Sequence, residues 1–248
     1  MSKSKSKLVS SLKKYVLEFL MLFLAVFLGF LADNYREAML EKSKEKKYIM
    51  SLIQDVEADK NDLIKIIRNN SHRKSYLDSL SAYCYAYHQS DHNVRKLYNY
   101  YPIVLQRPDF FVSNELTMIQ LKNAGGLRLI NNERVVKEIL QYDLQKALVR
   151  NQQEYYENYH NKAISSGLKI FNHQKLRTIW EMRLKGDTSN LDKIEYKLLK
   201  SAENLIPEFG NEINMYGGIV NYYNLLLNES NSKADSLIIS LKEAYGIE

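Results

Sequence analysis

The sequence predicts an all-α protein in which an N-terminal transmembrane helix is followed by a helical-bundle domain with long helices. Three observations lead to this prediction. A strongly apolar segment follows a lysine-rich start, three long stretches contain neither glycine nor proline, and apolar residues recur in those stretches at three- and four-residue steps. Strands would instead show sustained alternation of apolar and polar residues, which this sequence lacks.

Residues 15–32 are predicted to form a transmembrane signal anchor, preceded by a basic cytoplasmic tail at residues 1–14. As a helix, the apolar block covers roughly 25 Å, slightly less than a hydrocarbon core of about 30 Å. Tyr15 and Tyr35 are placed to anchor its two ends at the membrane interface. A cleaved signal peptide fits less well, because cleavage after Ala32 would put a phenylalanine where a small residue is expected.

The charges that flank this segment predict its orientation. Lys13 and Lys14 adjoin the apolar block on one side, whereas only Arg36 lies close on the other. Because positively charged flanks stay in the cytoplasm, we expect the N-terminus inside and the domain outside the cytoplasm. An inverted topology would instead make the domain a cytoplasmic-facing subunit.

Composition argues against some classes of protein. The formal net charge is +6, but the first 32 residues hold five lysines and one glutamate, so most of the excess lies outside the domain. A nucleic-acid-binding domain would carry a basic face of its own, so no nucleic-acid partner is predicted. Cys84 is the only cysteine, so no disulfide can form within the chain.

Residues 33–248 are predicted to form the helical-bundle domain. Its first part, residues 33–47, becomes a rigid helical stalk if the transmembrane helix continues into it without a break. Beyond the stalk, Ile49, Val56 and Leu63 lie seven residues apart, as in the seam of a helical bundle.

Two polar features modify this first long helix. Asp59 interrupts the apolar seam, which favours packing within the domain over a long isolated coiled coil. Residues 69–72, Asn-Asn-Ser-His, are predicted to bend the helix, because Asn and Ser side chains compete with the helical backbone for hydrogen bonds.

Glycine and asparagine residues mark the helices that follow. A short helix is expected to open at Ser113 and to close at the glycines of residues 125–126. Asn131 or Asn132 is placed to cap a long helix that continues towards Tyr159.

The last third of the chain contains weaker signals and then one strong one. Only short pieces are expected between residues 166 and 206, with a loop at residues 186–190. The final long helix is expected over residues 212–245, where apolar side chains share one broad face.

Two stretches are distinctive. Residues 30–37 read Phe-Leu-Ala-Asp-Asn-Tyr-Arg-Glu, and residues 121–133 read Leu-Lys-Asn-Ala-Gly-Gly-Leu-Arg-Leu-Ile-Asn-Asn-Glu. In these stretches and in its layout, the chain resembles an uncharacterised bacterial family of single-pass membrane-anchored helical proteins with a domain of unknown function. The resemblance implies membrane anchoring and helical architecture, and it supplies no catalytic residue.

Candidate metal ligands are few. Cys84, His88 and His92 are spaced four residues apart, but three side chains stacked along one helix would span about 12 Å, too far to share one ion. Glu157 and His160 match one Glu-x-x-His element of a di-iron bundle, which needs a second copy that this sequence lacks. We therefore predict no metal, no cofactor and no catalytic residue.

The tyrosines gather in clusters, and two explanations are open. They could stack on bases or sugars, or they could fill the bundle interior with their hydroxyls near water, which we favour. The clusters are Tyr83, Tyr85 and Tyr87; Tyr98, Tyr100 and Tyr101; Tyr155, Tyr156 and Tyr159; and Tyr222 and Tyr223.

The connector at residues 101–112 is unusually apolar for a loop and contains Pro102 and Pro108, which should prevent helix continuation. Phe110 and Phe111 either tuck under the bundle and plug its end, or form an exposed patch that docks a partner. They are the candidate interaction surface.

The sequence thus predicts a membrane-tethered, non-catalytic interaction or scaffold module of the bacterial cell envelope. Its expected location is the bacterial inner membrane, as a single-pass protein with a periplasmic C-terminal domain. Its expected partners are the lipid bilayer and either another protein or a second copy of the chain. The alternative is an enzyme of unfamiliar helical type that acts on an envelope substrate.

Overall fold

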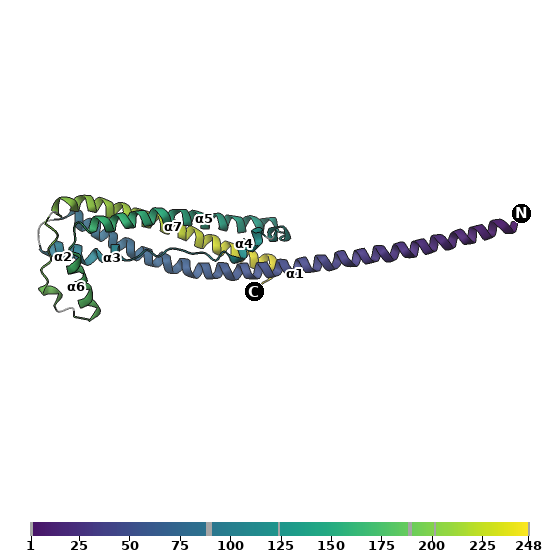
Figure 1. Cartoon of the computed structure of the whole chain (residues 1–248), viewed down its shortest axis with the longest axis horizontal. Helices are drawn as coiled ribbons and strands as arrows, with labels where there is room; N and C mark the ends of the chain where they lie inside the picture. The colour runs from purple at the N-terminus through teal and green to yellow at the C-terminus, as the bar shows by residue number, and fades with distance from the viewer. Residues whose placement is uncertain (1, 88–90, 124, 188–189, 201, 248) are drawn as a thin grey trace.

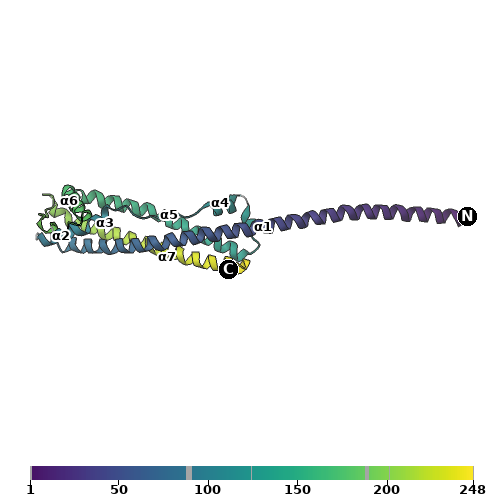
Figure 2. The same cartoon turned by 90° about the horizontal axis from the view of Figure 1, so that it is seen from below.

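The computed structural model describes residues 2–87, 91–123, 125–187, 190–200 and 202–247, and within them it is all-α, as predicted. One very long helix, α1 (Ser2–Tyr85), projects alone over its first half and joins a bundle over its second (Figures 1 and 2). The bundle is completed by α5 (Glu133–Gly167) and α7 (Ile206–Tyr245). Helix α7 packs along both α1 and α5.

The projecting half of α1 exposes its apolar side chains, and by length and composition it is the one helix in the described chain that could cross a membrane. Its large apolar side chains between Tyr15 and Leu31 are 44 to 71% exposed. Residues 33–44 are also exposed, and the bundle begins at Glu45, whose carboxylate accepts a hydrogen bond from the Tyr245 hydroxyl at 2.6 Å. The C-terminal end of α7 therefore lies beside the start of the bundle (Figure 1).

The bend predicted at residues 69–72 does not interrupt the helix, because α1 continues through these residues as one element. The polar side chains there are engaged elsewhere. Asn69 donates to Asp109 at 2.8 Å, and the Tyr156 hydroxyl donates to Asn70 at 2.9 Å. The Ser71 hydroxyl bonds back to a carbonyl of its own helix. None of these bonds breaks the helical ladder.

Two groups of buried side chains form the core. The proximal core, next to the projecting helix, includes Ile49, Leu52, Val56, Ile139, Tyr142 and Leu241. The distal core, at the other end, includes Leu63, Leu77, Tyr98, Tyr101, Phe171, Phe209 and Tyr223. The seam predicted from the seven-residue spacing is therefore buried and runs through both cores.

Asp59 is buried within that seam and is only 1% exposed. Its carboxylate accepts hydrogen bonds from the backbone N–H of Asn114 at 2.7 Å and from the Tyr142 hydroxyl at 2.9 Å. Burial raises the pKa of Asp59, and these hydrogen bonds offset part of that shift. The residue that interrupts the sequence pattern thus joins three segments within one domain.

The connector after α2 (Asp91–Tyr100) differs from its prediction. It opens with a one-turn helix, α3 (Pro102–Leu105), which tolerates Pro102 because a proline at the first helical position forfeits no hydrogen bond. Residues 106–115, which we call the strap, then run as non-helical chain along the bundle. The strap passes α1 in the opposite direction, because Gln106 is bound by Arg73 and Asn114 by Asp59.

Helix α4 (Leu116–Asn123) and the short 3-10 helix η1 (Gly126–Leu129) lead into α5 at the predicted cap. Gly125 has a φ of 68°, a left-handed conformation that favours glycine. The side chain of Asn132 accepts a hydrogen bond from the Val135 N–H. Helix α5 continues past Tyr159 to Gly167.

The distal end of the bundle carries the shorter elements, among them α6 (His173–Leu184), η2 (Leu191–Lys193) and η3 (Glu203–Leu205). Helix α6 leaves the bundle axis and projects sideways (Figure 1). Helix α7 begins at Ile206, earlier than the predicted residue 212, with a proline in its first turn.

Candidate functional site

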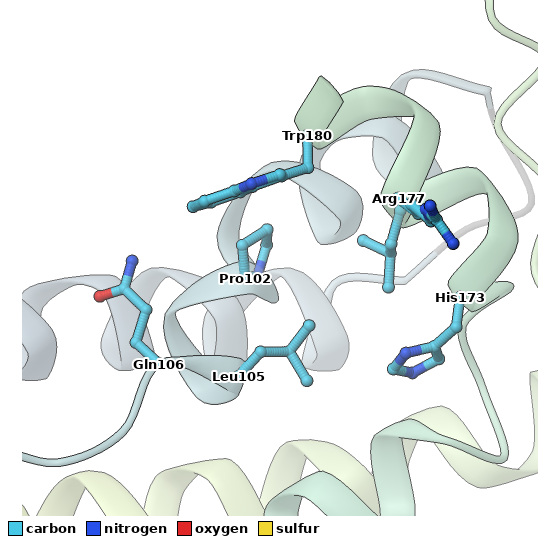
Figure 3. Close-up of a pocket in the computed structure, with 7 residues that line it drawn as sticks. Pro102, Leu105, Gln106, His173, Arg177 and Trp180 are labelled. Carbon is cyan, nitrogen blue, oxygen red and sulfur yellow. The ribbon is translucent and has the colours of Figure 1, made fainter. Parts of the chain in front are cut away.

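An open groove lies between α3 and α6 at the distal end of the bundle, and its volume is about 350 Å³ (Figure 3). The residues that line it are Pro102, Leu105, Gln106, His173, Leu176, Arg177 and Trp180. Trp180, the only tryptophan of the chain, is 51% exposed. Its indole lies on one side of the groove, with Leu105 and Gln106 on the other. This size is within the range of ligand sites.

The α3 wall of the groove is held in place by a buried arginine. Arg73, on α1, is 6% exposed. Its guanidinium donates to the carbonyl oxygens of Ile103 at 2.8 Å, Gln106 at 3.0 Å and Arg107 at 2.9 Å. These carbonyls lie at the C-terminal end of α3, where a cation is favourable. The backbone that carries Leu105 and Gln106 is therefore fixed.

The α6 wall is anchored by its N-cap and by an aromatic cluster. The side chain of Asn172 accepts a hydrogen bond from the Lys175 N–H at 3.2 Å, and its backbone N–H donates to the Tyr98 hydroxyl at 3.0 Å. The Phe171 ring stacks on the Tyr101 ring with centroids 3.9 Å apart. Helix α6 therefore starts from a buried, well-packed base.

Gly167, at the end of α5, is required by the same cluster. A Cβ atom at this position would overlap the Tyr101 ring and its hydroxyl. The stacking of Tyr101 on Phe171 leaves the ring little room to shift. The close approach of the end of α5 to Tyr101, the residue before α3, thus depends on this glycine.

The polar groups of the groove are few. His173 Nε2 lies 3.4 Å from the Tyr101 hydroxyl, and burial lowers the pKa of His173, so its imidazole is neutral at neutral pH. Arg177 lies at the rim and bonds Glu181 at 2.9 Å through Nε, and its side chain is 82% exposed. The groove therefore combines an apolar floor with one neutral histidine and one cation. It can hold an apolar group next to an anion.

The predicted interaction residues lie elsewhere, in the strap. Phe111 is 5% exposed, and its backbone N–H donates to the Tyr223 hydroxyl at 2.9 Å. The half-buried Phe110 ring meets Tyr156 edge-on, with centroids 5.4 Å apart. Both residues pack against α5 and α7, as the packing alternative expected, but along the side of the bundle, so the predicted plug at its end is wrong. Docking of a partner on this pair stays a prediction and would require the strap to leave the bundle.

The candidate metal ligands are not brought together in the described residues. Helix α1 ends at Tyr85 and α2 starts at Asp91, so the continuous helix assumed for the Cys84 series does not exist. His88 lies outside the described residues. No group of three or more His, Cys, Asp or Glu side chains that could hold a metal occurs where the structure is described. Burial raises the pKa of Cys84 to about 12, so its thiol stays protonated.

His160, the other candidate ligand, is a core residue. It is 6% exposed, and its Nδ1 lies 3.1 Å from the Tyr216 hydroxyl. Burial, and secondarily the nearby Arg73, lowers the pKa of His160 to about 4. Glu157, which would have to ligate beside it, is exposed.

Four of the eleven clustered tyrosines are fully buried, and four more, Tyr83, Tyr87, Tyr100 and Tyr159, are partly buried against the distal core, which agrees with the packing interpretation. The fully buried tyrosines are Tyr98, Tyr101, Tyr142, Tyr156, Tyr216 and Tyr223. Tyr85, Tyr155 and Tyr222 are exposed and scattered over different helices, so they form no obvious stacking platform.

Sequence reasoning missed the groove, because its residues come from segments without strong periodicity. The available signals were the single tryptophan in the weakly patterned region between residues 166 and 206 and the unusually apolar connector at residues 101–112, which supplies one wall. No protein-family model, curated protein or solved structure matches this chain. The candidate site therefore rests on geometry alone.

Proposed function

We propose that this chain is a membrane-tethered, non-catalytic interaction or scaffold module of the bacterial cell envelope, whose distal groove contacts a protein partner. The observation that carries the proposal is the continuity of α1. The same helix supplies the apolar segment and a full arm of the bundle, so the groove opens at the end of the molecule farthest from that segment (Figure 2).

The tether is supported by the exposure of the apolar half of α1. Every large apolar side chain described between Tyr15 and Leu31 is in contact with solvent in the isolated chain, a surface far larger than soluble proteins leave bare. A bilayer would cover it. The lysines at residues 13 and 14 favour a cytoplasmic N-terminus, which would place the domain in the periplasm and the protein in the inner membrane.

A binding role is supported by the composition of the groove. Tryptophan and arginine are the residues most enriched at the energetic centres of protein interfaces, and both line this groove. Catalysis would need a nucleophile next to a base, or a metal, and the lining residues offer one neutral histidine whose neighbour is a tyrosine. Burial raises the pKa of Tyr101, so this hydroxyl stays protonated.

Two measurements test the proposal. Reporters active in only one compartment, fused to the C-terminus, should report the periplasm. Activity of the cytoplasmic reporter alone would overturn the orientation. Affinity purification of the full-length protein from membranes should yield a stable partner that Trp180→Ala loses.

The matched control for this purification is Leu184→Ala. Leu184 is on the same helix and is 72% exposed, but it does not line the groove. It should retain the partner. Loss of the partner in both variants, or in neither, would contradict a role for the groove. Turnover of an envelope component by the purified protein would favour the enzyme alternative.

A further inference from the structure

We infer that the groove binds an apolar side chain of a protein partner together with a carboxylate beside it in the partner's chain. The inference rests on the proposed function, since it takes the groove to be the contact site and names the chemistry of the segment that fits.

The apolar half of the inference comes from the groove walls. Pro102, Leu105, Leu176 and Trp180 line one space from two helices. Figure 3 shows Pro102, Leu105 and Trp180 around this space. Both walls are held by buried contacts, so the groove exists before a ligand arrives and little ordering is needed on binding. An exposed indole on such a fixed element is suited to cover an apolar side chain inserted beside it.

The charged half comes from Arg177. Its only bonded neighbour in the described chain is Glu181, one turn further along the same helix, and the bond uses Nε alone. An exposed ion pair of this kind contributes little stability, so a ligand carboxylate can compete for the guanidinium. The two terminal nitrogens can each donate a hydrogen bond to the two oxygens of one carboxylate, as a fork.

The same set of groups argues against other ligands. A nucleic acid or another polyanion is recognised by several cations along a groove, whereas this lining contains a single arginine. His173 adds no charge, because burial lowers its pKa. One cation beside an apolar floor matches one carboxylate beside one apolar side chain.

The sole tryptophan provides a direct readout. Because Trp180 lies in the groove, its fluorescence in the full-length protein, held in detergent micelles, reports occupancy without a label. The probes are three end-blocked pentapeptides. The first carries adjacent aspartate and phenylalanine, the second replaces aspartate with asparagine, and the third replaces phenylalanine with serine.

We expect a saturable change for the aspartate–phenylalanine peptide, about tenfold weaker binding of the asparagine peptide, and no saturation with the serine peptide. A tenfold ratio is the order expected for one charge-assisted hydrogen bond. Arg177→Gln should abolish the preference for aspartate. Glu181→Gln should increase it, because the competing carboxylate is removed.

The control variant is Arg183→Gln. Arg183 is on the same helix, outside the groove lining, and bonds Asn99 at 2.7 Å. It should leave all three peptides unchanged. Equal binding of the aspartate and asparagine peptides, or a preference that survives Arg177→Gln, would overturn the carboxylate inference while leaving the groove as a binding site. If none of the three peptides changes the Trp180 fluorescence, the inference as a whole is overturned. The co-purification comparison of Trp180→Ala with Leu184→Ala still tests the proposed function separately.

Discussion

The two halves of α1 follow opposite rules on one continuous helix. In the first half, side chains such as Phe23 and Leu24 are exposed whichever way they point. In the second half, Ile49, Val56 and Leu63 are buried on one face while polar residues cover the other. Secondary structure is therefore the same in both halves, and only the pattern of apolar residues differs.

This difference shows what the pattern decides. A uniformly apolar helix has no polar face. It therefore cannot pack against a protein neighbour on one side while facing water on the other. A seven-residue spacing produces a stripe that a second helix can cover, and α7 does so. The first half has no such stripe, whereas the second is covered by a partner helix.

The largest expected effect comes from removing the first half. Deleting residues 1–32 should move the protein from the membrane fraction to the soluble fraction. The helical circular dichroism of the shortened chain should persist, because both cores begin beyond this segment. A chelator should not change this signal, because no metal is predicted to hold the fold. Fractionation and spectroscopy check both points.

Deleting residues 2–14 provides the control, because it keeps the apolar segment and should leave the protein in membranes. A shortened chain without residues 1–32 that still pellets with membranes would break the comparison. So would one that loses its helical signal.

A smaller effect is expected from a matched pair of phenylalanine truncations. Phe111→Ala removes a 5% exposed ring from the distal core and should lower the free energy of unfolding by about 3–5 kcal/mol. Phe23→Ala removes a 55% exposed ring from the first half and should leave the melting temperature of the domain unchanged. Thermal melts of the two variants decide the matter. Equal shifts would show that the projecting half of α1 contributes to the stability of the domain as the distal core does, and a wild-type melt for Phe111→Ala would return the strap to the candidate docking surfaces.

The smallest effect is electrostatic and arises inside the bundle, at His160 on α5. The pKa of His160 is about 4 in the folded chain, below its ordinary value near 6.5, because burial disfavours the charged form. The unfolded chain therefore binds a proton in this window that the folded chain refuses. The free energy of unfolding is therefore unaffected by His160 above pH 6.5 and decreases as the pH falls from 6.5 towards 4. Between pH 7 and pH 5 this decrease should amount to about 2 kcal/mol.

Denaturant unfolding at the two pH values measures this loss, with His160→Gln as the reference. A glutamine can keep a hydrogen bond to Tyr216 but cannot titrate. The variant should therefore lose about 2 kcal/mol less than the wild type between pH 7 and pH 5. An identical pH dependence for the two proteins would show that His160 is not buried as described.

Local signals predicted much of the fold. The seam through Ile49 and the cap at Asn132 follow from spacing and from side-chain chemistry within a few residues, so the sequence reveals them. The continuity of α1 at Asn70 could not be predicted, because its hydrogen-bond partner, Tyr156, comes from a distant helix. The groove depends on the same kind of long-range contact, such as Arg73 with the carbonyls of α3.

If the proposed tether is correct, the length of α1 also sets the distance between the membrane and the groove. From Asp33 to Arg73, which holds the α3 wall, the helix rises by roughly 60 Å at 1.5 Å per residue. No glycine or proline interrupts this rise, so the distance is fixed rather than averaged over a flexible linker. Neighbouring copies in one bilayer would present their grooves in a single plane. A partner with repeated binding segments lying parallel to the membrane would then engage several copies at once, with an avidity that no single groove could provide.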